Sequence, residues 1–115
     1  MIKDLKRGRD EALQLVARFK KLRDHRDLRE WNEYRKAKKE RFQEELDGIL
    51  EELQDLTKKF DAAKRAIGLT NKLPKDDEKR SYFRSKAFGH LNRFRAAIRR
   101  LEKSITVLER EFNYE

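Results

Sequence analysis

Two long runs of apolar residues, spaced alternately by four and three positions, constrain this chain more than any other feature. The first run consists of Phe42, Leu46, Ile49, Leu53, Leu56, Phe60, Ala63 and Ile67. The second run consists of Ala87, Leu91, Phe94, Ile98, Leu101, Ile105, Leu108 and Phe112. This spacing is typical of a helix that buries one narrow stripe against another helix. The two runs therefore predict an antiparallel coiled-coil hairpin, with residues 68–77 as its loop.

A shorter helix is predicted to precede the hairpin, over residues 2–23. Its apolar face is broader than a heptad stripe and consists of Leu5, Ala12, Leu15, Val16, Phe19 and Leu22. Gly8 is expected to weaken its first turns. We expect this helix to pack on the hairpin at the end away from the loop, which leaves the loop end with two helices. The predicted fold is thus all-α, a three-helix bundle in one domain, 1–115.

The junction between the first two helices has two interpretations. Asp27 could cap a new helix with Glu30 reaching back to it, which predicts a second helix over 28–67. Alternatively, one unbroken helix could cover 2–67, because no residue between Asp24 and Asp27 forbids helix.

The loop is bounded by two further signals. Gly68 is predicted to end the second helix in the left-handed conformation. Asp76 and Asp77 are candidate caps for the last helix, which is predicted over 78–113.

Composition excludes several classes of function. The chain has 115 residues and no cysteine, so disulfides, thiolate metal sites and a cysteine nucleophile are excluded. It also has no apolar run near the roughly 20 residues that cross a bilayer and no signal-peptide pattern at its start. We expect a cytoplasmic protein without a cofactor or metal, and one that does not associate with membranes, because its apolar faces are needed for helix packing.

The charge is strongly positive and unevenly distributed. The net charge is +9, and 46% of the residues are charged. Residues 1–41 carry 15 basic and 8 acidic side chains, residues 42–67 carry 4 and 7, and residues 68–115 carry 12 and 7. Such a balance favours polyanionic partners, either nucleic acid or an acidic protein.

The last predicted helix is the first candidate site. Between residues 79 and 103 it has a single acid, Glu102, and nine basic residues. The nine are Lys79, Arg80, Arg84, Lys86, Arg93, Arg95, Arg99, Arg100 and Lys103. Small residues lie between them, namely Ser85, Gly89, Asn92 and Ala96. Small side chains let a phosphate backbone approach, and the arginine fork suits phosphate oxygens.

A purely structural interpretation of these charges is also open. In the hairpin register, acidic residues between 44 and 55 lie opposite 95–106, so several arginines could form loose surface pairs worth at most about 1 kcal/mol each. Residues 79–93, however, face 58–72, which is itself basic except for Asp61.

A second candidate site is the basic run that precedes the first heptad stripe. It consists of Arg35, Lys36, Lys38 and Lys39. Trp31 and Tyr34 lie just before it, and basic residues beside aromatic ones are typical of sites for single-stranded nucleic acid. The alternative is that both aromatic side chains belong to the core of the three-helix end.

The spacing of Arg84 and His90 resembles the Arg and His motif of the HEPN ribonucleases, which are helical bundles. That resemblance implies RNA cleavage at a dimer interface, with the His moving a proton. The spacing is short and permissive, and we predict no catalytic residue and no enzyme.

The sequence as a whole predicts a non-catalytic protein that binds nucleic acid without sequence specificity, through phosphate contacts from the last helix. The alternative is a structural or adaptor protein that binds an acidic protein or forms a larger assembly. A homodimer is expected, because the two-helix end leaves Leu50, Phe83 and Phe88 partly exposed.

Overall fold

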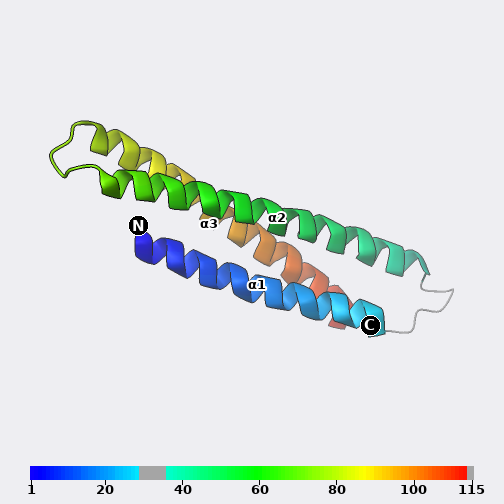
Figure 1. Cartoon of the computed structure of the whole chain (residues 1–115). Coiled ribbons are helices and arrows are strands. Elements are labelled where there is room, and N and C mark those ends of the chain that lie inside the picture. The colour runs from blue at the N-terminus through cyan, green and yellow to red at the C-terminus, as the bar shows by residue number, and fades with distance from the viewer. Residues whose placement is uncertain (29–35, 114–115) are drawn as a thin grey trace.

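A computed structural model describes residues 1–28 and 36–113, which form three α-helices and no strand (Figure 1). The helices are α1 (Ile2–Leu28), α2 (Lys36–Lys72) and α3 (Lys79–Asn113). The molecule is elongated, with extents of 67 × 19 × 17 Å. The predicted all-α, three-helix fold is confirmed.

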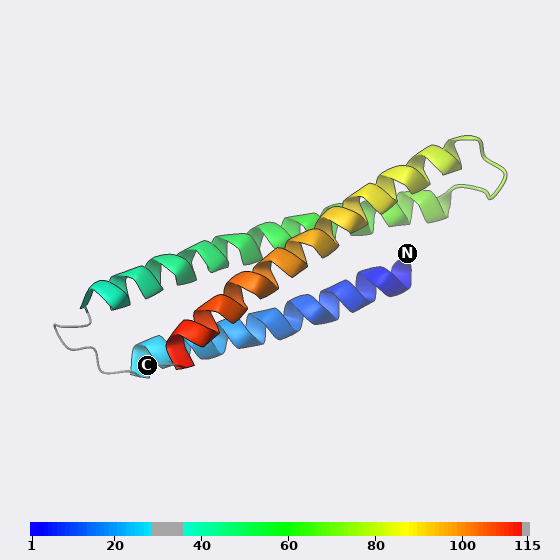
Figure 2. The ribbon, with the colours of Figure 1, turned by 180° about the vertical axis from the view of Figure 1, so that it is seen from behind.

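The helices run up, down and up along the long axis. α2 and α3 form an antiparallel hairpin, and α1 lies alongside both (Figures 1 and 2). One unbroken helix over residues 2–67 is therefore excluded. α1 is the shortest helix, and its amino end stops well before the loop that joins α2 to α3. We call residues 58–95 the turn end, which α1 reaches at Phe94 and Arg95, and the rest of the bundle the three-helix end.

The core is formed by the apolar residues that the heptad spacing identified. In α2 every residue of the first run is buried, except Phe60, which is partly buried. In α3 the second run is buried from Ala87 to Leu108, while the side chain of Phe112 lies outside the described ones. α1 adds Leu5, Leu15, Phe19 and Leu22 to this core. Burial of these stripes stabilises helices that would be marginal alone.

Gly8 has a packing role that the sequence did not reveal. A Cβ atom at Gly8 would lie 2.7 Å from Cε2 of Phe94 and 3.4 Å from Cδ1 of Ile98. The absence of a side chain therefore lets α1 approach the α3 core closely. Gly8 weakens the helix locally but permits the α1–α3 contact.

α1 is longer than predicted, because it continues to Leu28 instead of ending near residue 23. Asp27 thus lies within α1 and does not begin a new helix. The extension places Arg26 beside α2, where its Nη1 atom donates a hydrogen bond to Oε1 of Gln43. The predicted start of the second helix at 28 is wrong, because residue 28 is the last of α1, and Glu30 lies outside the described residues.

The turn is shorter than predicted. α2 passes through Gly68 and ends at Lys72, and no described glycine has a positive φ, so the predicted left-handed ending at Gly68 is corrected. Pro74 sets the end instead, since proline disfavours helical conformation in the residue before it. α3 begins at Lys79, close to the prediction, and Asp77 is its cap: Oδ1 accepts a hydrogen bond from the Lys79 amide at 2.9 Å.

Candidate nucleic-acid interface

The side of α3 turned away from α2 is open at the turn end. Ser85, Gly89, Asn92 and Ala96 follow the helical spacing of four and three residues, so they share this outer side. Ser85, Asn92 and Ala96 are exposed, and a Cβ atom at Gly89 would meet nothing within 4 Å. These small residues leave room for a ligand to approach the helix backbone.

Basic residues form a row along each flank of this open strip. The first row repeats every seven residues and consists of Lys79, Lys86, Arg93 and Arg100, all of them exposed. The second row lies toward the side on which α1 packs and contains Arg84, Arg95 and Arg99. Both rows therefore reach the same open surface of α3 from opposite sides.

These basic side chains lack acidic partners among the described residues. The described ion pairs involve Arg9, Arg18, Arg23, Arg41 and Lys59, and none of the nine basic residues between 79 and 103. Arg100 lies close enough to Asp55 for its charge to contribute to the lowered pKa of that carboxyl, but ion pairs with described carboxylates do not account for the charge between Lys79 and Arg95.

Arg80 is an exception to the predicted binding role. It is half-buried, and its Nη1 atom donates a 2.6 Å hydrogen bond to the carbonyl oxygen of Leu73. This bond satisfies a carbonyl group just beyond the end of α2, where a helix leaves acceptors without partners. Arg80 therefore stabilises the turn between α2 and α3.

Two aromatic side chains lie among the basic ones, which the sequence analysis did not identify as a feature. Nζ of Lys86 lies 4.7 Å from the ring centroid of Tyr82, and the guanidinium carbon of Arg84 lies 5.6 Å from that of Phe88. Tyr82 is 58% exposed and Phe88 is 39% exposed. The spacing of four residues between each ring and its cation was the available signal.

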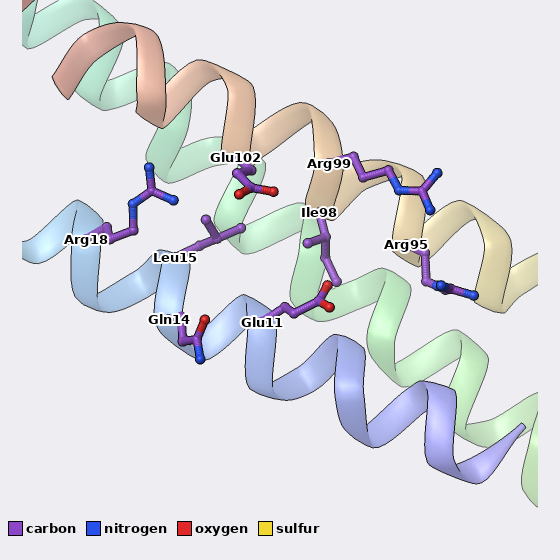
Figure 3. A pocket seen from close by; sticks show the side chains of 8 residues that line it. All are labelled: Glu11, Gln14, Leu15, Arg18, Arg95, Ile98, Arg99 and Glu102. Atoms are coloured by element: carbon purple, nitrogen blue, oxygen red, sulfur yellow. The ribbon is translucent and has the colours of Figure 1, made fainter. Parts of the chain in front are cut away.

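Arg95 and Arg99 belong to a different environment, a pocket of about 350 Å³ between α1 and α3 (Figure 3). Glu11 and Arg18 line it from α1, and Glu102 lines it from α3. The pocket therefore has mixed charge. In Figure 3 the side chain of Arg99 extends away from Glu102.

Arg18 links α1 to α3 beside that pocket. It forms an ion pair with Glu109, and its Nη2 atom donates a 3.0 Å hydrogen bond to the hydroxyl oxygen of Thr106. The hydrogen bond to Glu109 raises the pKa of the Arg18 guanidinium, against the opposing effect of burial. Arg18 therefore remains charged and holds α1 against α3.

Lys103 lies beside the acidic part of α2. It lines a shallow pocket of about 360 Å³ together with Glu45 and Glu52. The predicted acidic neighbours are thus present beside this end of the basic row. The basic side chains without a described ion pair or a carboxylate-lined pocket are therefore concentrated nearer the turn, at Lys79, Arg84, Lys86 and Arg93.

The second predicted cluster is not brought near the first. Lys36, Lys38 and Lys39 are exposed at the start of α2, at the opposite end of the molecule from the turn (Figure 1). Arg35, Trp31 and Tyr34 lie outside the described residues, so their predicted roles remain predictions.

Arg84 and His90 occupy different sides of α3, because six residues correspond to about 240° around a helix. Among the described residues, no group of three His, Cys, Asp or Glu side chains is placed to hold a metal ion. None of the described helices is long and apolar enough to cross a membrane.

No protein-family model matches the chain, and no curated protein or solved structure is significantly similar to it. Functional inference therefore depends on the chemistry of its own side chains.

Proposed function

We propose that this protein binds nucleic acid without catalysing a reaction, and that it contacts phosphates through the basic rows of α3 at the turn end. The observation that carries the proposal is the charge of that end. Residues 58–95 contain twelve Lys and Arg against four Asp and Glu, and the exposed basic residues of α3 have no described carboxylate partner. Unneutralised, clustered basic charge is the electrostatic footprint of polyanion binding.

The dimensions of the first basic row support a phosphate backbone as the ligand. From Lys79 to Arg100 the helix rises about 32 Å at 1.5 Å per residue. One turn of duplex DNA is about 34–36 Å long along its axis, so a straight row of this length is long enough to meet phosphates on both sides of a groove. Phosphate contacts carry no sequence information by themselves, which predicts non-specific binding that salt weakens steeply.

The test is a fluorescence-anisotropy titration of the full chain with labelled DNA and RNA at 50 and 200 mM salt. We expect a linear fall of log K with log salt, with a slope that reports the number of neutralised phosphates. The double substitution Lys86→Glu with Arg93→Glu should weaken binding at least tenfold. The matched control is Lys20→Glu with Lys21→Glu, an equal charge change at exposed sites on α1.

Two results would oppose the proposal. Absence of binding at 50 mM salt would exclude it. Equal weakening by the α1 and α3 doubles would show that net charge alone drives binding and that α3 is not the site.

A second candidate function is binding of an acidic protein partner, and one observation favours it. A pocket of about 480 Å³ on α2 is lined by three basic residues (Lys64, Arg65 and Lys72), by the acidic Asp61, and by Gly68 and the exposed Leu69. An exposed apolar residue beside three basic residues and one acidic residue suits an acidic segment with an apolar anchor. Leu69→Asp should then prevent partner binding and leave nucleic-acid binding at its wild-type level.

We also propose that the protein forms a homodimer and that its α2–α3 hairpin is a coiled coil. Leu50 and Phe88 are exposed and Phe83 is half-buried, so these side chains are available to a second copy. Light scattering should give twice the chain mass of 14.0 kDa if the dimer forms, and the chain mass itself if it does not.

A further inference from the structure

Tyr82 and Phe88 are large aromatic side chains that lie exposed on the basic surface of α3. A large aromatic ring that is 58% exposed, as Tyr82 is, contributes little to the core. Both residues precede Phe94, where α1 packs through Gly8, and the amino end of α1 stops short of the turn (Figure 2). The Tyr82 ring contacts the Phe83 ring edge-on at 5.5 Å between centroids, and neither Tyr82 nor Phe88 belongs to the buried core.

Each exposed ring is paired with a cation that can also reach a ligand. Lys86 lies over Tyr82 and Arg84 lies over Phe88, both on the same helix. A cation on a flexible stem can stay near a ring and bind a phosphate beside it, and a guanidinium plane can itself stack on a base. The two pairs thus combine an aromatic platform with a phosphate contact.

The two platforms lie six residues apart, about 9 Å along the helix axis and about 120° around it, so they stand on opposite flanks of the open strip. The exposed Ser85 lies between them in sequence on the open strip. No bulky side chain therefore stands on the strip between the rings. A strand that crosses this strip could place one base on each ring.

Resting on the proposed function, we propose that the turn end of α3 prefers single-stranded nucleic acid, with unpaired bases stacked on Tyr82 and Phe88 and neighbouring phosphates held by Arg84 and Lys86. Duplex bases are already stacked on one another, so they cannot use these rings. Base stacking on aromatic side chains is tolerant of sequence, because every base has a flat face.

The experiment compares a labelled mixed-sequence 20-nucleotide strand with its duplex, using the full chain at 50 and 200 mM salt. We expect the single strand to bind at least tenfold more tightly than the duplex. Tyr82→Ala and Phe88→Ala should each weaken single-strand binding by about fivefold to a hundredfold, and should leave duplex binding unchanged. Tyr82→Phe, which keeps the ring, should retain wild-type binding.

Val107→Ala is the matched control, because Val107 is a 51% exposed apolar residue on the same helix, at the three-helix end. It should leave both affinities unchanged. Equal affinity of the wild-type chain for strand and duplex, or wild-type single-strand binding by both alanine variants, would overturn the stacking inference and leave the phosphate contacts standing. Absence of binding to either form would instead overturn the proposed function on which the inference depends. The wild-type comparison of strand with duplex needs no variant, so it tests the inference independently of how the variants fold.

Discussion

The turn end and the three-helix end are both built around the heptad runs of α2 and α3, but they differ in charge. Residues 58–95 hold twelve basic and four acidic residues, whereas the rest of the chain holds nineteen and eighteen. At the three-helix end, Arg18 pairs with Glu109 and Arg41 lies 3.7 Å from Glu111, so charges there join α3 to its neighbours. At the turn end, the described ion pair that reaches it joins Lys59 to Asp55 within α2.

This difference separates charge used for folding from charge left for binding. A basic residue with a carboxylate partner on another helix has a structural explanation. The exposed basic residues of α3 between 79 and 93 have no such partner among the described residues, and a third helix does not cover them. We therefore propose the binding site at these residues, because intramolecular ion pairs do not explain their charge.

The largest expected effect is on the free energy of unfolding, and it is seen by comparing two phenylalanines of α3. Phe94 is 1% exposed, its ring lies 5.5 Å from that of Phe60, and it fits against Gly8 of α1. Phe94→Ala should therefore lower the free energy of unfolding by about 3–5 kcal/mol. Phe88→Ala, at the exposed turn-end site, should change it by no more than about 0.5 kcal/mol. Urea denaturation followed by circular dichroism measures both, and similar losses would contradict the contrast.

The next effect concerns two glycines. Gly8→Ala introduces a Cβ atom 2.7 Å from the buried Phe94 ring, whereas Gly48→Ala meets nothing within 4 Å. Both variants gain about 1 kcal/mol of helix propensity, but only Gly8→Ala adds overpacking of about 1–3 kcal/mol. The Gly8 variant should therefore be less stable than the Gly48 variant by about 1–3 kcal/mol in thermal or urea unfolding. Equal stabilisation of both would show that α1 does not pack closely at Gly8.

Much of this fold was readable from the sequence, because helix packing selects apolar residues at a fixed period. Leu46, Ile98 and Leu101 are buried where the heptad placed them. Helix ends were less readable, since they depend on tertiary contacts. Gly68 stays helical and α2 ends at Lys72, shortly before Pro74. α1 continues to Leu28, which brings Arg26 into contact with Gln43.

The sequence predicted the positive charge of the candidate site, but not which of its basic side chains are free to bind a ligand. The nine basic residues were identified in sequence, yet only the structure separates Arg80, which binds the Leu73 carbonyl, from Arg84, which lies over Phe88. Arg95 likewise lies beside α1, in a pocket that no local pattern predicts. Charge is a property of a residue type, whereas the availability of that charge depends on what packs around it.

A smaller effect tests the cross-helix pairing of the three-helix end. Arg18 holds Glu109 and Thr106 of α3, and its side chain is about one-third exposed. Arg18→Ala should cost about 1 kcal/mol, and a double-mutant cycle with Glu109→Ala should give a coupling energy of about 0.5–1 kcal/mol. Arg93→Ala, at the turn end, should leave stability within about 0.5 kcal/mol of wild type. A larger loss at Arg93 than at Arg18 would reverse the comparison between the two ends.

The smallest effect lies at the boundary between the two regions, where the hydrogen bond from Lys59 lowers the pKa of the exposed Asp55 carboxyl. A carboxyl whose pKa is lower in the folded chain than in the unfolded chain stabilises the fold above its unfolded value, near 3.9, and loses that contribution as the pH falls through the folded value. Asp55→Asn should therefore be slightly less stable than wild type between pH 5 and 7, and the difference should vanish in stronger acid. Asp61→Asn is the control, because it removes the same charge from an exposed turn-end site without a described ion pair. If unfolding measured from pH 2 to 7 shows the same acid dependence for both variants, general charge balance and not the Lys59 contact governs stability at this boundary.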